Sequence, residues 1–220
     1  YSEVLGENTK FWRSAGLDHL FFLTEEPAGQ RLLDRMSDTG TLKYLRNHHT
    51  FSKHEILGHQ VGGEVYGEDE NGNPVYNFEK INRIFAEYVK RGIKPIVEYD
   101  YMPKELAKGE VIKEKDEGFL TNDTGPSDWN KWEDLIRRFT ENLIETFGLS
   151  EVRTWYFEVW NEPDFWPSED IETFYKMYDV FTETVKSVDQ NLRVGGPGCY
   201  RADFMKGFLE HITRGTNYVT

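Results

Sequence analysis

Short apolar runs alternate with long amphipathic runs along this chain of 220 residues, and this alternation most constrains its fold. The short runs have the character of buried strands, and the long ones have the apolar spacing of helices that cover a sheet. A repeated strand–helix order favours βα units on a largely parallel sheet. We predict strands over 10–16, 41–49, 93–101, 154–160, 192–196 and 217–220, and helices over 27–37, 78–91, 135–147, 174–188 and 201–212.

The predicted units stop short of a closed barrel, which needs eight of them and typically about 250 residues. A doubly wound open sheet is the alternative, but neither Gly62-Gly63 nor Gly195-Gly196-Pro197-Gly198 matches a phosphate-binding loop. We therefore interpret residues 1–220 as one α/β domain, an incomplete (β/α)8 barrel that covers about strands 1 to 6. An open barrel exposes strand edges, which predicts self-association and makes a homo-oligomer possible.

Three connections are predicted as loops. Residues 17–26 follow the first strand, 50–77 form a long polar excursion, and 102–128 form a second. Asn71-Gly72 favours a tight turn, so we expect a small hairpin within the first excursion.

Charge and cysteine content exclude several function classes. Thirty-nine acids against 26 bases give a formal charge of −13, which argues against nucleic acid as a partner. No apolar run of about 18 residues is present to span a membrane. Cys199 is alone, so neither an internal disulfide nor a thiolate metal cluster is expected. These features leave the compartment open.

No cofactor motif is found, and no metal site is predicted. His49, His54 and His59 are expected to be solvated loop histidines, because no helical spacing brings them together. The chain starts at Tyr1 without a charged and apolar leader, so we expect it to begin inside a longer gene product.

Residues 155–164, Trp-Tyr-Phe-Glu-Val-Trp-Asn-Glu-Pro-Asp, carry the clearest chemical signal. An aromatic strand ends in Asn161 and Glu162, and Pro163 stops it because proline has no N–H for the ladder. Proline also biases Glu162 away from helical backbone angles. A carboxyl group held at a strand end beside aromatic rings suits general acid catalysis, because partial desolvation favours its neutral form.

The chain resembles glycoside hydrolase family 39, the group of β-xylosidases and α-L-iduronidase. The matching segments follow the family order along nearly the whole chain. They are Phe11-Trp12-Arg13-Ser14-Ala15-Gly16, Leu45-Arg46-Asn47-His48, Tyr76-Asn77-Phe78, Pro95-Ile96-Val97-Glu98, Met102-Pro103-Lys104, residues 155–164 and Val194-Gly195-Gly196-Pro197. The resemblance implies a (β/α)8 barrel with Asn-Glu at the end of the fourth strand and a nucleophile at the end of the seventh.

The resemblance also assigns roles to individual residues. It implies that Glu162 is the general acid/base, that Asn161 binds the sugar 2-hydroxyl, and that His48 contacts the sugar, although His48 could instead be paired within the barrel wall. Phe165 and Trp166 could line a sugar subsite or pack the loop.

Two further strand residues are expected to have a structural role rather than a catalytic one. For Arg46 and Glu98 we favour a structural ion pair. No residue matches the nucleophile, and Glu98, the only other strand-end carboxylate, belongs to the third strand.

The implied function is hydrolysis of terminal sugars with retention, by one acidic and one ionised carboxyl group. The segment 97–104 is closer to the xylosidase pattern, whereas 11–14 is closer to iduronidase. The open alternatives are an iduronidase-like or other family 39 exo-glycosidase, and a non-catalytic carbohydrate-binding barrel. In either case the partner is a carbohydrate.

Overall fold

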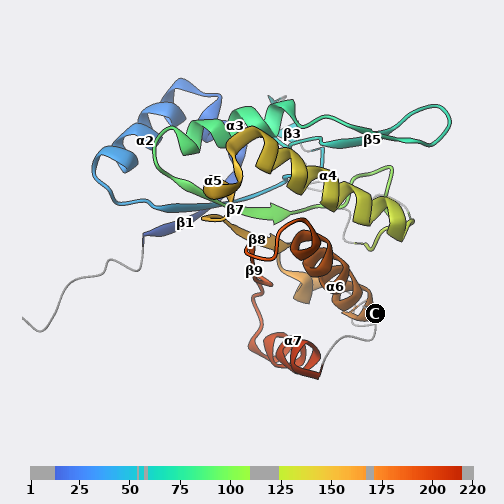
Figure 1. Ribbon diagram of the computed structural model, residues 1–220. Helices are drawn as coiled ribbons and strands as arrows, with labels where there is room; N and C mark the ends of the chain where they lie inside the picture. The colour runs from blue at the N-terminus through green and yellow to red at the C-terminus, as the bar shows by residue number, and fades with distance from the viewer. Residues whose placement is uncertain (1–12, 54, 57–58, 110–123, 167–170, 215–220) are drawn as a thin grey trace, which may run out of the picture.

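A five-stranded parallel sheet forms the centre of the molecule (Figure 1). The structure is a computed structural model that describes residues 13–53, 55–56, 59–109, 124–166 and 171–214. The strands are β1 (Ser14–His19), β2 (Tyr44–His48), β7 (Lys94–Tyr99), β8 (Tyr156–Val159) and β9 (Arg193–Val194). They lie side by side in chain order. A doubly wound sheet reverses its order at a switch point, so this uniform order is that of a barrel arc.

The five strands confirm five of the six predicted ones, with differences at their ends. The predicted first strand, 10–16, is displaced toward the C-terminus, because β1 extends to His19; residues 10–12 lie outside the described residues. The predicted strand at 217–220 also lies outside them.

Helices connect the strands and lie along the sheet. They are α1 (Leu20–Thr24), α2 (Pro27–Asp38), α3 (Glu79–Val89), α4 (Trp129–Phe147), α5 (Leu149–Val152), α6 (Ile171–Val188) and α7 (Ala202–Arg214), with a 3-10 turn η1 (Pro163–Phe165). The five predicted helices are confirmed. The loop predicted over 17–26 was wrong, because β1 and α1 occupy most of it. A five-residue helix is too short to display a helical period in the sequence.

The predicted hairpin is confirmed as β5 (Tyr66–Glu68) and β6 (Pro74–Tyr76). Its turn is longer than the two residues that Asn-Gly favours. The Asp69 carboxylate accepts the backbone N–H groups of Asn71 and Asn73, both at 2.8 Å, and so closes a five-residue turn. A second pair, β3 (Glu55–Ile56) and β4 (His59–Gln60), lies in the same excursion.

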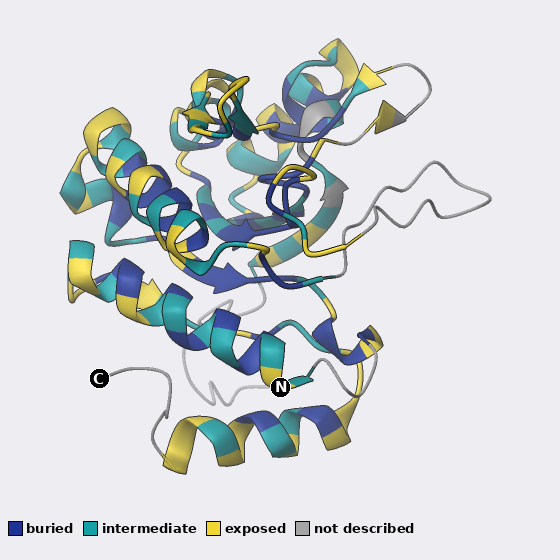
Figure 2. Cartoon of the chain, turned by 90° about the vertical axis from the view of Figure 1, so that its right-hand side faces the viewer, coloured by how far each residue is buried: buried dark blue, intermediate teal, exposed yellow. Residues whose placement is uncertain are grey.

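The core lies between the sheet and the helices, where the buried sides of α3, α4 and α6 meet it (Figure 2). All four apolar residues that define the predicted α3 face are buried: Ile81, Ile84, Phe85 and Tyr88. Helix α4 starts where Asp128 accepts the N–H of Asn130 at 2.9 Å, as an N-cap does. None of the helices in the described ranges is both long and apolar enough to span a bilayer.

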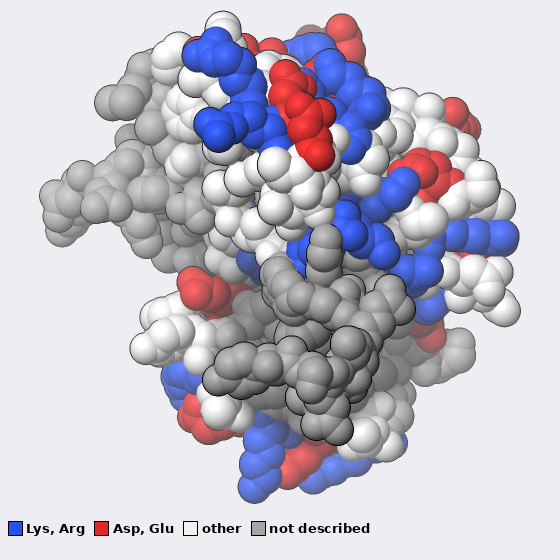
Figure 3. All heavy atoms as spheres, turned by 90° about the vertical axis from the view of Figure 1, so that its left-hand side faces the viewer, with Lys and Arg blue, Asp and Glu red and all other residues white. Residues whose placement is uncertain are grey.

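Charged side chains of both signs are interleaved on the face that lies to the left in Figure 1 (Figure 3). At the end of α3, Glu87 pairs with Lys90 at 2.5 Å and with Arg91 at 2.8 Å. Arg91 also reaches Asp34 of α2 at 2.6 Å, so this group ties the two helices together.

Glu87 provides a test of this helix contact. Burial alone would raise the pKa of Glu87, but hydrogen bonds from Lys90, Arg91 and Gln30 lower that pKa to about 2. A lowered folded-state pKa stabilises the protein above the ordinary carboxyl value, and the gain is lost as pH falls from about 4.5 toward 2. We expect Glu87→Gln to lower the free energy of unfolding by about 1 kcal/mol at neutral pH, after allowance for solvent screening.

Urea denaturation at pH 7 and pH 3 measures this difference. The deficit of the variant should shrink at the lower pH. Glu145→Gln, an exposed change on α4, is the matched control and should have little effect at either pH. A deficit of equal size at both pH values would contradict the assignment.

Candidate active site

The predicted site residues gather at the carboxyl ends of three neighbouring strands. Arg46 and His48 come from β2, Glu98 from β7, and Asn161 and Glu162 directly follow β8. Parallel register places Glu98 beside Glu158. Since side chains alternate along a strand, Arg46 and His48 share one face of β2, while Leu45 and Asn47 are buried on the other.

Arg46 is the centre of this group. Its guanidinium pairs with the carboxylates of both Glu98 and Glu158. Its Nη1 and Nη2 atoms also lie 3.3 Å from Asn161 Oδ1. Burial alone would lower the pKa of Arg46, but Glu98 and Glu158 outweigh it and hold that pKa above its ordinary value. The structural ion pair predicted for Arg46 and Glu98 is therefore confirmed, and it extends to a third residue.

Gly198 completes the wall behind Arg46. A Cβ atom at this position would lie 2.5 Å from Arg46 Nη2, so a side chain there would displace the guanidinium. The Gly198 carbonyl accepts the Glu162 N–H at 2.7 Å. One glycine thus gives the arginine its space and fixes the backbone of Glu162.

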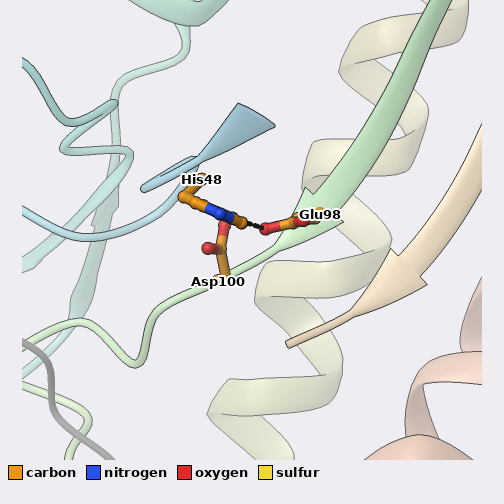
Figure 4. A group of neighbouring side chains, drawn as sticks. All are labelled: His48, Glu98 and Asp100. Carbon is orange, nitrogen blue, oxygen red and sulfur yellow. Dashed lines mark hydrogen bonds and ion pairs between the residues drawn. The ribbon is translucent and has the colours of Figure 1, made fainter. Parts of the chain in front are cut away.

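His48 points at Glu98, with Nδ1 2.6 Å from Oε2 (Figure 4). Asp100 lies below them and accepts the backbone N–H groups of His49 at 3.0 Å and Thr50 at 3.1 Å. Burial raises the pKa of Glu98 and of Asp100 well above the ordinary value, and the charge of Glu98 adds to the effect on Asp100. Asp100 therefore anchors the chain where it leaves β2.

The donor atoms of His48, Glu98 and Asp100 lie within 4.8 Å of one another, a spacing that could hold a cation. Both carboxylates are already engaged, however: Glu98 by Arg46 and Asp100 by two backbone N–H groups. A guanidinium inside the group would also repel a metal ion. The donor set fits a charged hydrogen-bond network better than a metal centre.

Asn161 and Glu162 lie on an unusual stretch of backbone. Trp160 and Glu162 have φ of 69° and 51°, in the left-handed region that residues other than glycine seldom adopt. Such conformations cluster at functional sites. Glu162 thus avoids the right-handed helical angles that Pro163 disfavours, but it does not adopt the extended angles that a following proline favours. Its side chain is exposed.

The Asn161 amide is held at both ends. Its Oδ1 faces Arg46, and its Nδ2 donates to the Tyr101 hydroxyl at 3.0 Å. This pairing fixes which end of the amide is the donor. These contacts hold the amide in place, and they therefore also fix the direction in which the second N–H of Nδ2 points.

The two aromatic residues that follow Glu162, Phe165 and Trp166, differ in their exposure to solvent. Trp166 is only 5% exposed and packs edge-on against Trp160 and Phe174, at centroid distances of 4.9 and 6.1 Å. Its burial favours the packing role over the predicted contact with a sugar. Phe165 is 65% exposed.

Of the three loop histidines, one differs from the prediction. His49 is buried, its ring centroid lies 4.9 Å from that of Tyr101, and its Nδ1 lies 3.1 Å from the Ser52 hydroxyl, so its assignment as solvated was wrong. His59 is exposed, and His54 lies outside the described residues.

Sequence reasoning missed Glu158 and Tyr101, which complete the Arg46–Asn161 network. A charged residue inside the aromatic run 155–160 was an available signal, because buried charges are rare unless paired. Tyr101 gave no such signal, since tyrosine is common in strands. Glu98 is fully buried and paired, so it is not accessible as a nucleophile.

Known proteins are similar to this chain in sequence and in fold. The family pattern described as glycosyl hydrolases family 39 matches residues 2–220. A β-xylosidase of Geobacillus stearothermophilus is 42% identical over 70% of this chain and 30% of its own length. Human α-L-iduronidase is 33% identical over 41% of this chain and 15% of its own.

A solved family 39 β-xylosidase from Caulobacter crescentus superposes with a TM-score of 0.77 at 31% identity, over 94% of this chain and 44% of that protein. The chain thus spans less than half the length of these three relatives. The fold is accordingly part of the TIM barrel of these enzymes. Because the family pattern covers almost the whole chain, it belongs to glycoside hydrolase family 39.

Proposed function

We propose that this chain carries the acid/base half of a retaining exo-glycosidase site, that it forms an incomplete (β/α)8 catalytic domain over residues 1–220, and that its substrate is a β-xyloside. The observation that carries the proposal is the Asn161 amide, held by Arg46 and Tyr101 directly before the exposed Glu162. Glu162 protonates the leaving oxygen and later deprotonates water. Asn161 Nδ2 donates to the sugar 2-hydroxyl, and His48 contacts the sugar from β2.

The other carboxylate of the mechanism has no candidate in the sequence. In retaining enzymes the two carboxyl groups lie about 5–5.5 Å apart, so that one attacks the anomeric carbon directly. The family resemblance puts this nucleophile at the end of a seventh strand. We propose that sequence beyond these 220 residues contributes it.

Local charge favours a neutral sugar over an iduronide. Arg46, the cation next to Asn161, is already paired with two carboxylates. Among the described residues, no further lysine or arginine forms an ion pair with Glu98 or Glu158, so the carboxylate of an iduronide would lack a cationic partner there. A xyloside carries no charge and needs no such partner.

Hydrolysis of 4-nitrophenyl β-D-xyloside by the protein at its full natural length tests the proposal. We expect proton NMR to show β-xylose first, with the α anomer growing only by mutarotation, because two displacements retain configuration. Initial α-xylose would contradict retention. Cleavage of the matching α-L-iduronide alone would favour the iduronidase-like alternative, and binding of xylose without turnover would favour the non-catalytic one.

A further inference from the structure

Two aromatic rings stand exposed beside Glu162. Phe165 and Tyr200 are 65% and 76% exposed, the highest values among the large hydrophobic side chains of the described residues. Their ring centroids lie 6.0 Å apart with the planes inclined by 32°. Exposed apolar residues that cluster, rather than scatter, mark binding surfaces.

The two rings come from different segments that a buried carboxylate joins. Phe165 ends η1, whereas Tyr200 follows β9. Between them, Asp164 is 4% exposed and accepts the backbone N–H groups of Tyr200 at 3.0 Å and Arg201 at 2.6 Å. The backbones that carry the rings are therefore fixed before any ligand arrives, which lowers the entropy cost of binding.

The pair is also tied directly to the general acid/base. The Phe165 N–H donates to the Glu162 carbonyl at 3.0 Å, and the Glu162 N–H donates to the Gly198 carbonyl, two residues before Tyr200. The backbone that carries the two rings is thus joined to the backbone that carries the acid.

The order of the sheet decides which part of a substrate lies there. From β2 to β9, His48 comes first, Asn161 and Glu162 follow at β8, and Tyr200 lies after β9. His48 and Asn161 bind the sugar that is cleaved off, and Glu162 protonates the oxygen that links it to the leaving group. The leaving group therefore extends away from His48, toward β9.

We propose that Phe165 and Tyr200 form a platform for the leaving group, and that its occupant is a second pyranose ring, whose C–H face stacks on the aromatic rings. This inference rests on the proposed function, because it requires Glu162 to act at the bond between the two sugars. The platform binds the leaving sugar and takes no part in proton transfer.

The double variant Phe165→Leu/Tyr200→Leu in the full-length protein tests the platform, with three xylosides that differ only in the leaving group. Leucine keeps an apolar side chain but removes the flat ring. We expect kcat/KM for xylobiose to fall about tenfold, since the variant loses both flat faces on which the leaving sugar would stack. Hydrolysis of β-xylosyl fluoride, whose leaving group has no ring, should stay within about twofold and also shows that the variant is folded.

Each outcome decides between the possibilities. Equal losses on all three substrates, or no loss on any of them, would overturn the platform. A loss confined to 4-nitrophenyl xyloside would overturn a sugar as the occupant and identify an aryl group instead. If the wild-type protein cleaves none of the three substrates, the proposed function is wrong, and the platform proposal, which rests on it, is wrong as well. Tyr156→Leu is the matched control at the opposite end of β8, 41% exposed, and should affect all three substrates alike.

Discussion

Replacing Glu162 by Gln should lower kcat/KM for xylobiose by about a thousandfold, because a positioned general acid contributes about 10²–10⁴ to such reactions. Glutamine keeps the shape of the side chain but cannot donate a proton to the leaving oxygen. Dinitrophenolate departs without protonation, so kcat/KM for 2,4-dinitrophenyl β-xyloside should fall less than about tenfold. Steady-state kinetics with the two substrates measures the contrast.

The parameter kcat/KM is the decisive one here. It reports the steps up to formation of the glycosyl-enzyme, whereas kcat also contains the later attack of water, which Glu162 assists as a base. Asp203→Asn, an exposed change at the start of α7, is a matched control and should leave both values unchanged. Equal losses of kcat/KM on the two substrates would contradict the role of Glu162 as general acid.

The second large effect concerns stability. Arg46→Met should lower the free energy of unfolding by about 3–5 kcal/mol, because it removes the cation that pairs with Glu98 and Glu158 and leaves buried charge uncompensated. Burial already holds the folded-state pKa of Glu98 above its unfolded value, so the folded protein binds that proton more tightly. Its contribution therefore becomes less favourable as pH rises from about 4 through the raised pKa.

This pH dependence should be steeper without Arg46, since the guanidinium counteracts it in the wild type. Urea denaturation at pH 5 and pH 8 should show a smaller deficit for Arg46→Met at pH 5. Arg214→Met removes an exposed partner of Glu210 on α7 and should cost less than about 0.5 kcal/mol at either pH. A deficit below about 1 kcal/mol for Arg46→Met would show that the network contributes little.

The large elements of this fold could be predicted because each has a repeated pattern. Ile81, Ile84, Phe85 and Tyr88 recur at helical spacing, and all four are buried in α3. Strand ends were less accurate: the strand predicted over 192–196 is only Arg193–Val194. Helix α1 was missed because local propensity over five residues is a weak signal compared with tertiary packing.

The candidate site likewise contains residues that could be predicted from the sequence and contacts that could not. Asn161 and Glu162 were found because Pro163 marks where their strand ends. The pairing of Arg46 with Glu158 was not, because it depends on register between strands that are 112 residues apart in the chain. Trp166 is buried and its neighbour Phe165 is exposed, because Trp166 packs against Phe174. Two adjacent aromatic residues in a sequence do not show which of them will make such a contact.

Asp164 has a consequence for protein engineering. Its carboxylate joins the turn after Glu162 to the backbone at Tyr200 and Arg201, so these two segments are not independent modules. A library that varies 163–166 alone would mostly sample turns that no longer match 199–201. Grafting a new leaving-group preference onto this scaffold would require both segments to be exchanged together, with the aspartate retained as the joint between them.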